Sequence, residues 1–195
     1  RELRANRVFA AWLNHDDSRG INSLDMLEGQ KTGPGFIRHY MFDFGSIMGS
    51  GSTSPQTLRA GNEYILEWAP ALKTLATFGL YVRPWILTKY WEGAKSVGRF
   101  EGDAFDPVKW RPEYPNPAFN NKRADDAFWG ARLVSRFSDE AINAVVAKGR
   151  YTDPGAAEHI ATTLMKRRDK VVRAWLTAVN PLVDARLGAD GTLQF

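Results

Sequence analysis

Cysteine is absent from the 195-residue sequence, which excludes disulfides and metal sites built on thiolates. The compartment stays open, because cytoplasmic and exported proteins can both lack cysteine. No apolar run approaches the roughly 20 residues that cross a bilayer, so we expect no transmembrane segment. The charges spread through residues 1–13 (RELRANRVFAAWL) are not typical of a signal peptide. Because an initiator Met is also missing, we expect the chain to be a piece of a longer protein.

Positive charge is in small excess, with a net charge of +4, and no nucleic-acid-binding motif accompanies it. The densest basic cluster is KRRDKVVR, at residues 166–173. Its charges alternate with Leu164, Val171, Val172 and Trp175 at helical spacing, which favours a solvated helix face over a site for phosphate backbone or anionic lipid. We therefore expect no nucleic-acid partner.

The first third of the chain predicts a helix, a polar loop and a hairpin. Apolar residues at three- and four-residue spacing predict a helix over 2–13, and HDDSRGIN (15–22) predicts the loop. Segments 23–27 and 36–42 predict strands, joined by the turn-rich GQKTGPG (29–35). Since paired strands end together, the polar loop and the DFG tripeptide at 43–45 should lie at the same end of the ribbon.

The remainder predicts mostly helix. Segment 46–57 is rich in Gly, Ser and Thr and predicts a mobile loop bordering a site. Segment 82–121 should be largely irregular, with aromatic residues wrapped over the core and short helices within it. Helices are expected over 59–81 with a kink or restart at Pro70, over 124–137, from an N-cap at Ser138 to Gly149, and from Asp153-Pro154 to Pro181. The fold class is therefore α+β, predominantly α.

The polar loop and the DFG carry the residue types that phosphoryl transfer requires. The reaction needs a carboxylate that orients the attacking hydroxyl, and a cation beside the transferred phosphoryl group. It also needs carboxylate and amide oxygens on the metal that bridges the nucleotide phosphates. These needs are met in turn by Asp17, by Arg19, and by Asp43 with Asn22.

In this register the sequence resembles the protein-kinase-like superfamily. Its catalytic loop has a His, an Asp two residues on, often a basic residue two after that, and an Asn five after the Asp; His15, Asp17, Arg19 and Asn22 match it. The metal-binding Asp-Phe-Gly stands unaltered as Asp43-Phe44-Gly45, behind an apolar strand. Both motifs in the correct order are a far more specific signal than either alone.

The resemblance implies roles for these residues. Asp17 would orient the acceptor hydroxyl as catalytic base, and Arg19 would lie near the γ-phosphate of ATP. Asn22 and Asp43 would hold Mg²⁺ or Mn²⁺ on the nucleotide, and the Phe44-Gly45 turn would complete that cofactor-binding segment. His15 would brace the loop against the DFG. The acceptor would be a protein or a small hydroxyl-bearing molecule.

Several departures from the family pattern stand out. The insert between loop and DFG is longer than in typical eukaryotic kinases, which indicates an atypical bacterial or secreted branch. Ala69-Pro70 resembles the end of an activation segment, but Ala71 stands where Glu belongs. Asp126, before Trp129-Gly130, resembles the helix that supports the catalytic loop.

The small lobe of a kinase is missing. No glycine-rich phosphate loop and no strand with a nucleotide-anchoring Lys precedes residue 15, and GSGS at 49–52 lies on the wrong side of the motifs. We interpret residues 1–182 as a kinase-like large lobe and 183–195 as a loosely held tail. The missing N-lobe of the same polypeptide is the expected partner, and the isolated chain should bind ATP weakly and be inactive.

Two alternatives remain. The chain could be a pseudokinase-like scaffold, as the missing lobe and Ala71 indicate. It could instead be a metal-dependent hydrolase, although the sequence has no HExxH or His-x-His spacing. The hydrolase would use the five candidate ligands His15, Asp16, Asp17, His39 and Asp43.

Overall fold

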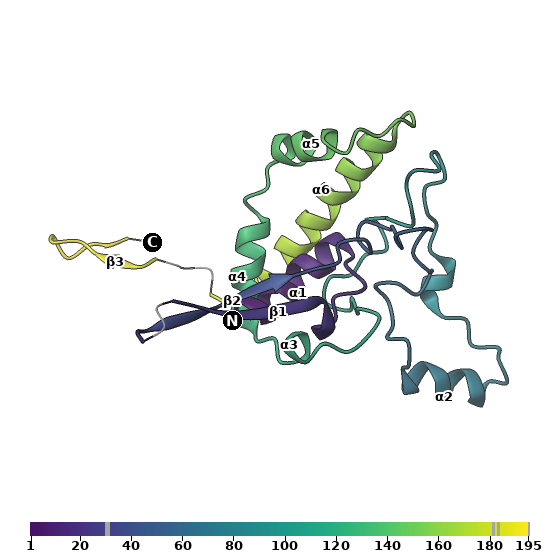
Figure 1. Ribbon diagram of the computed structural model, residues 1–195, viewed down its shortest axis with the longest axis horizontal. Coiled ribbons are helices and arrows are strands. Elements are labelled where there is room, and N and C mark those ends of the chain that lie inside the picture. Colours follow the sequence, from purple (N-terminus) through teal and green to yellow (C-terminus); the bar gives the residue numbers. More distant parts are fainter. Residues whose placement is uncertain (30–31, 181, 183, 195) are drawn as a thin grey trace.

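A computed structural model describes residues 1–29, 32–180, 182 and 184–194. This part of the chain is α+β and mostly helical, as predicted. Figure 1 shows a helical body from which a hairpin, an arm that carries α2 and a C-terminal hairpin project. The helices are α1 (Glu2–Leu13), α2 (Trp68–Ala76), α3 (Pro117–Asn120), α4 (Ala124–Val134), α5 (Asp139–Ala147) and α6 (Ala156–Trp175), with 3-10 turns η1 (Gly20–Asn22) and η2 (Pro84–Leu87). The strands are β1 (Ser23–Gly29), β2 (Gly35–Met41), β3 (Arg186–Leu187) and β4 (Leu193–Gln194).

The core lies where α1 packs against α4 and α6. Small and β-branched residues meet there: Val8 on α1, Val134 on α4 and Val171 on α6 are fully buried. Gly130 lets α4 approach α1 closely, because a Cβ at this position would lie 2.9 Å from the carbonyl oxygen of Ala5. In the described residues no helix is both long and apolar enough to span a bilayer.

Strands β1 and β2 form the predicted antiparallel hairpin, with a register that runs from Ser23 opposite Met41 to Gly29 opposite Gly35. Residues 30 and 31 of the predicted turn lie outside the described residues. The ladder continues one step past its strands, because the Phe42 amide donates to the Asn22 carbonyl at 2.9 Å. Asn22 and Asp43 are thereby brought to the root of the hairpin.

The long irregular segment 82–121 is held by α1. Arg7 is buried between the rings of Trp110 and Trp175, at 5.8 and 5.7 Å from their centroids. Its guanidinium donates to the carbonyl oxygens of Pro107, Val108 and Trp110. These bonds explain how a segment with few helices, η2 and α3 as predicted, stays ordered over the core.

Some predicted helix boundaries are wrong. The helix expected over 59–81 exists only as α2, and Pro70 lies in its first turn, where a missing N–H costs little. Helix α4 ends at Val134, three residues before the predicted end, whereas Ser138 caps α5 as expected by accepting from the Ala141 amide at 3.2 Å.

Helix α6 begins at Ala156 after Gly155, because the Asp153 carboxylate accepts from the Ser96 amide at 3.0 Å instead of capping the helix. It ends at Trp175, before the predicted end at Pro181, and Pro181 itself lies outside the described residues. The tail contains the short hairpin β3–β4, which the sequence analysis did not predict.

Candidate functional site

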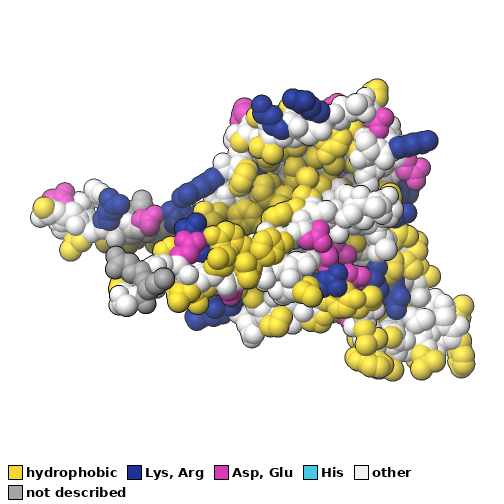
Figure 2. All heavy atoms as spheres, in the orientation of Figure 1, with side chains coloured by type: hydrophobic (Ala, Val, Ile, Leu, Met, Phe, Trp, Pro, Cys, Tyr) yellow, Lys and Arg dark blue, Asp and Glu magenta, His cyan; other side chains and the backbone are white. Residues whose placement is uncertain are grey.

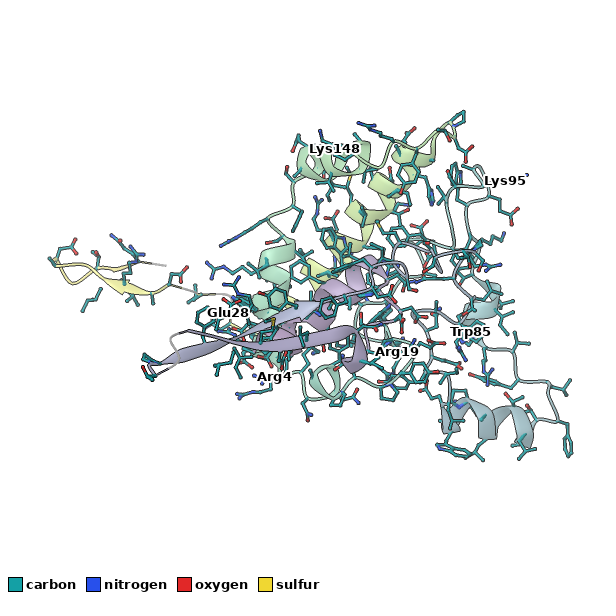
Figure 3. The ribbon with its side chains drawn as sticks, viewed as in Figure 1. Arg4, Arg19, Glu28, Trp85, Lys95 and Lys148 are labelled. Atoms are coloured by element: carbon teal, nitrogen blue, oxygen red, sulfur yellow. The ribbon has the colours of Figure 1, made fainter. Side chains whose placement is uncertain are left out.

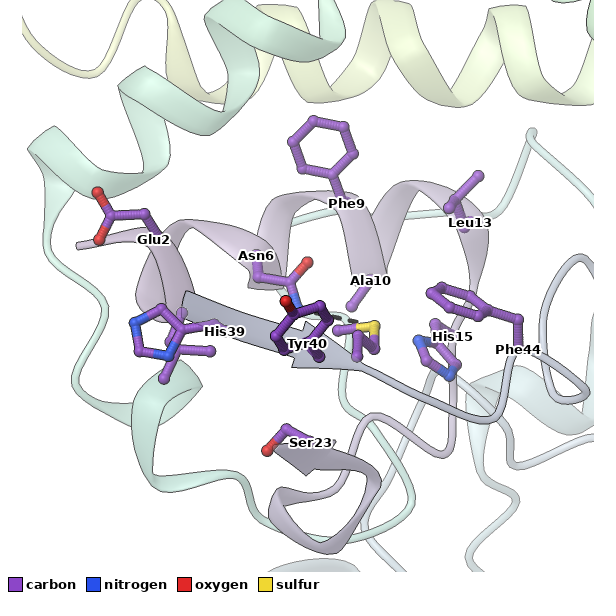
Figure 4. A pocket seen from close by; sticks show the side chains of 12 residues that line it. Glu2, Asn6, Phe9, Ala10, Leu13, His15, Ser23, His39, Tyr40 and Phe44 are labelled. Atoms are coloured by element: carbon purple, nitrogen blue, oxygen red, sulfur yellow. Dashed lines mark hydrogen bonds between the residues drawn. The ribbon is translucent and has the colours of Figure 1, made fainter. Parts of the chain in front are cut away.

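The two motifs that the sequence singled out meet in space. Helix α1 ends at Leu13, and the left-handed backbone of the next residue, Asn14 (φ 51°), turns the chain sharply and directs His15 inward. The His15 ring is buried, bonds through Nε2 to the Asp43 carbonyl oxygen at 3.1 Å, and stacks on Phe44 at a centroid distance of 5.5 Å. Figure 4 shows the two rings face to face. His15 therefore braces the loop against the DFG, as the sequence analysis expected.

The protonation state of His15 follows from this contact. Burial lowers the pKa of the His15 imidazole below its ordinary value of 6.5, so the ring is neutral at pH 7. A carbonyl oxygen only accepts, so Nε2 carries the proton in this bond. His15 thus acts as a neutral structural link between residues that are 28 positions apart.

Asp17 is held by the two other loop residues of the motif. Its Oδ1 accepts from Arg19 Nε, and its Oδ2 accepts from Asn22 Nδ2 at 3.1 Å. Asn22 Nδ2 also donates to the Asp17 main-chain oxygen at 2.9 Å, so Asn22 holds both the main chain and the carboxylate of Asp17. The Arg19 guanidinium lies 4.6 Å from the centroid of the Tyr114 ring, near the root of the hairpin (Figure 3). The loop thus presents a partly exposed carboxylate with a cation beside it.

Asp43 faces solvent beside this loop and has a left-handed backbone (φ 54°), a conformation that Asp tolerates better than most residues. Its Oδ1 accepts from the Gly45 amide at 3.3 Å. Gly45 packs closely on the loop 46–57, because a Cβ at this position would meet the Ser52 hydroxyl, which would have to rotate away. The Ser52 amide in turn donates to the Gly45 carbonyl oxygen at 3.2 Å. The loop 46–57 therefore folds back onto the DFG and borders the site.

A buried polar network, which the sequence analysis missed, fixes the start of the loop. Asn14 donates through Nδ2 to Gln56 Oε1 at 2.7 Å, and its Oδ1 accepts from Trp110 Nε1 at 2.8 Å. Gln56 Nε2 also donates to the Asn14 and Ser46 carbonyl oxygens. One side chain thus ties the end of α1 to two distant segments. The only sequence signal was an Asn placed directly after a predicted helix.

Arg167, on α6, caps the C-terminal end of α1. It donates to the carbonyl oxygens of Ala11, Trp12 and Glu101 at 2.6 to 2.9 Å and lies 3.6 Å from the Phe105 ring centroid. Burial lowers the pKa of its guanidinium to about 9. Two of these oxygens belong to the last turn of α1, where the helix leaves its carbonyls unpaired.

This contact corrects the expectation that the cluster at 166–173 is a solvated helix face. Arg167 is buried, and Lys166 and Lys170 donate to the side chain and backbone of Asp103. A signal was present, since Arg167 lies three residues after Leu164 and four before Val171, on the apolar stripe of the helix.

The five candidate ligands of a metal-dependent hydrolase do not converge. Asp16 accepts from the Gly61 amide at 3.1 Å, and His39 bonds to Asp25 at 2.7 Å on the hairpin. Burial raises the pKa of the Asp16 carboxyl to about 6, which suits a brace within the fold. Within the described residues, no group of three or more His, Asp or Glu side chains could hold a metal ion.

Asp126 does not support the loop, contrary to the resemblance. Its carboxylate accepts from Arg4 on α1 and from the Arg123 amide, and Arg4 lowers its pKa to about 2. It therefore joins α1 to α4. Ala71 lies in α2, where the structure buries no side chain.

An open pocket of about 340 Å³ lies beside the site, between α1 and β2, and Phe44 and His15 line one end of it (Figure 4). Its walls are mostly apolar and are formed by Glu2, Leu3, Asn6, Phe9, Ala10, Leu13, His15, Ser23, His39, Tyr40, Met41 and Phe44. The pocket leaves the ring of Phe44 accessible from one side, whereas His15 is buried.

Comparisons with protein families, with curated proteins and with solved structures found no match for this chain. A functional assignment therefore depends on the geometry of residues 15–22 and 43–45.

Proposed function

We propose that this chain is the large lobe of an atypical, kinase-like, ATP-dependent phosphotransferase. Asp17 orients the acceptor hydroxyl and accepts its proton, and Arg19 supplies positive charge beside the transferred phosphoryl group. His15 positions the loop. The acceptor is a protein or a small molecule with a hydroxyl group.

One observation carries this proposal: the contact of His15 with the Asp43 carbonyl oxygen and the Phe44 ring. The whole β1–β2 hairpin separates the two motifs in the sequence. The hairpin alone brings the two segments to the same end of the ribbon, but it does not require His15 Nε2 to bond to the Asp43 carbonyl oxygen or its ring to stack on Phe44. Their contact, with Asn22 bonded to Asp17, supports a common origin of both motifs in one site.

The donor set suits Mg²⁺ or Mn²⁺ with a nucleotide. The Asp43 carboxylate and the Asn22 amide oxygen are hard oxygen ligands, and both residues lie at the root of the hairpin. Two protein ligands are too few for a closed metal cage, but they suffice for an ion that shares its coordination with phosphates and water. A bound ion of this kind would neutralise charge on the phosphates.

The nucleotide also needs a cover on its far side. We propose that a small N-lobe of the same polypeptide supplies it and contacts the apolar pocket between α1 and β2. Phe9, Leu13 and Phe44 in that pocket are only partly covered in this chain. Without this lobe the chain should bind ATP weakly.

The test compares Asp43→Ala with Asp25→Ala in the full-length protein. Transfer of the γ-phosphate from ATP to the protein itself or to added acceptors is measured with Mg²⁺. Asp43→Ala should slow transfer by roughly 100-fold or more. Asp25 lies exposed on the hairpin, pairs with His39 and serves as the matched control, so its variant should keep the wild-type rate. Wild-type transfer by Asp43→Ala would refute the proposal.

A pseudokinase-like scaffold is the second candidate. It is favoured by the closed contacts of Asp17, whose two carboxylate oxygens are already engaged by Arg19 and Asn22. Full-length protein that is stabilised against heat by ATP with Mg²⁺, but transfers no phosphate, would select this candidate. Loss of that stabilisation in Asp43→Ala would place the nucleotide at the same site.

A further inference from the structure

The arm that carries α2 exposes apolar side chains in an unusual concentration. Trp68, Leu72 and Leu75 follow one another at i, i+4 and i+7 on α2, and each is more than half exposed. The chain then turns at Phe78, which is 96 % exposed, and Leu80, which is 84 % exposed. Figure 2 shows hydrophobic side chains gathered at this end of the molecule, where α2 lies in Figure 1. Contiguous apolar surface of this kind marks a contact site.

The apex of the arm is an ordered turn. Phe78 and Gly79 both have left-handed backbones (φ 49° and 86°), which a bulky residue such as Phe adopts only at a cost in free energy. The Gly79 amide donates to the Thr74 carbonyl oxygen at 2.8 Å and closes the end of α2. The backbone thus holds an aromatic ring outward in a defined position.

The main-chain amides of the apex are also paired. The amides of Thr77, Phe78 and Leu80 donate to main-chain oxygens within residues 73–77. The Thr77 hydroxyl donates to the Lys73 carbonyl oxygen and accepts from the Tyr81 amide. Paired amides lower the cost of placing the apex at the boundary between headgroups and acyl chains, where an unpaired donor is expensive.

The charges around the apex are mostly positive. Residues 65–89 contain Lys73, Arg83 and Lys89, and their one acidic residue is Glu67, at the start of the arm, whose carboxylate accepts from the Tyr64 amide. Arg83 is paired with Glu63 at 3.3 Å, but among the described residues neither lysine forms an ion pair. A cationic flank behind an apolar tip complements an anionic surface that has an apolar interior.

We propose that residues 65–89 form a membrane-binding arm that inserts Leu75, Phe78 and Leu80 between the lipids of an anionic bilayer. Lys73 and Lys89 contact the headgroups, and the amphipathic rings of Trp68 and Tyr81 lie at the boundary between headgroups and acyl chains. The arm lies on the bilayer surface and does not span it. This proposal does not depend on phosphoryl transfer.

Vesicle co-sedimentation tests the proposal, with phosphatidylcholine vesicles and with vesicles that also contain phosphatidylserine. The wild-type chain should bind the anionic vesicles, and more weakly as salt is added. Phe78→Asp should weaken this binding by roughly tenfold or more, because it places a charge at the inserted apex. Asp tolerates the left-handed backbone, so this variant should remain folded. Val145→Asp, on an exposed apolar residue of α5, is the matched control and should bind as the wild type does.

Substitutions of the lysines test the proposal independently of the apolar apex. Lys73→Glu should weaken binding to the anionic vesicles by about fivefold or more. Lys148→Glu, at the exposed end of α5, should leave binding unchanged. The proposal is overturned if the wild type does not bind anionic vesicles, or if Phe78→Asp binds as well as the wild type. It is also overturned if Phe78→Asp abolishes self-association in sedimentation velocity and changes no lipid binding, since the apex would then contact a second copy.

Discussion

The loop at 15–22 and the arm around α2 are both short on regular structure, yet they are held in opposite ways. The loop is fixed by side chains from distant parts of the sequence: Gln56 and Trp110 bond to Asn14 before it, and Arg167 caps the helix that leads into it. The arm is held by local bonds within residues 70–81, and α2 buries no residue. In this fold, buried polar contacts therefore position the loop, whereas the arm, whose residues 65–89 are all described, has none.

This contrast has an energetic consequence. A buried polar group that loses its partner costs the free energy of its desolvation, whereas an exposed apolar side chain can be removed at little cost. Substitutions that support the loop should therefore destabilise the fold strongly. Substitutions on the arm should change binding and leave stability almost unchanged.

The largest expected effect is that of Arg167→Met. The variant keeps the apolar stem but leaves the carbonyl oxygens of Ala11, Trp12 and Glu101 without their donor. The free energy of unfolding should fall by about 3–5 kcal/mol, as measured by urea denaturation. Lys166→Met, one position away and exposed, is the control and should cost less than about 1 kcal/mol. A similar cost for both variants would mean that the cap on α1 is not what holds the loop.

The next effect should come from Asn14→Ala. This variant loses the bonds to Gln56 and Trp110, and it also forces Ala, which cannot bond to the backbone through its side chain, into a left-handed conformation. The expected loss is about 2–3 kcal/mol of unfolding free energy. Asn14→Gly keeps the backbone relaxed and loses only the network, so it should cost about 1 kcal/mol less than Ala. Equal losses for Ala and Gly would show that the backbone conformation contributes nothing.

Predictions from sequence succeeded where a local pattern decides the structure. Helix α1 was correct to the residue and the hairpin nearly so, because apolar spacing and turn residues carry the information within a few positions. The N-cap at Ser138 was also predicted correctly, because its bond to the Ala141 amide joins residues only three positions apart. The proximity of loop and DFG also followed locally, since a hairpin brings its two ends together.

Predictions failed where residues far apart in sequence decide the structure. The helix over 59–81 was overpredicted, because exposed apolar residues such as Ile65 and Leu75 have the spacing of the buried stripe of a packed helix. Asp153 is a residue type that is favoured at N-caps, but its carboxylate bonds to the Ser96 amide, 57 residues away. Gln56 and Trp110 could not be connected with the loop, because nothing local marks a side chain that bonds to a distant residue. For Arg167 the apolar stripe indicated burial, but it did not indicate which carbonyl oxygens the guanidinium would meet.

An effect of similar size, but one that depends on pH, should come from Asp16. Its folded pKa of about 6 lies above the ordinary value of 3.8, so between these values the folded protein holds a proton that the unfolded chain has released. The associated stability is fully present below about pH 4 and is lost as the pH rises through 6, a loss of about 2–3 kcal/mol. Asp16→Asn keeps an acceptor for the Gly61 amide and cannot ionise. Its stability should therefore be flatter between pH 4 and 7 than that of the wild type, measured by urea denaturation across this range.

Asp25→Asn, on the exposed hairpin, is the control for this profile and should leave the pH dependence of the wild type intact. A profile for Asp16→Asn as steep as that of the wild type would show that Asp16 is ionised in the folded protein. The anchored region would then hold a charged carboxylate, and the bond from the Gly61 amide with the attraction of the nearby Arg59 would have to outweigh the cost of burial.

The smallest effect should be found at the apex of the arm. Phe78 makes almost no contact, so Phe78→Gly loses no packing; the relief of the left-handed backbone is offset by the greater entropy of Gly in the unfolded chain. Stability should stay within about 0.5 kcal/mol of the wild type. Phe78→Val should cost about 1 kcal/mol, because a β-branched residue tolerates this backbone least. A loss of more than about 2 kcal/mol in Phe78→Gly, measured by urea denaturation, would mean that the ring packs on the body. The arm would then be anchored like the loop, and the difference between the two regions would disappear.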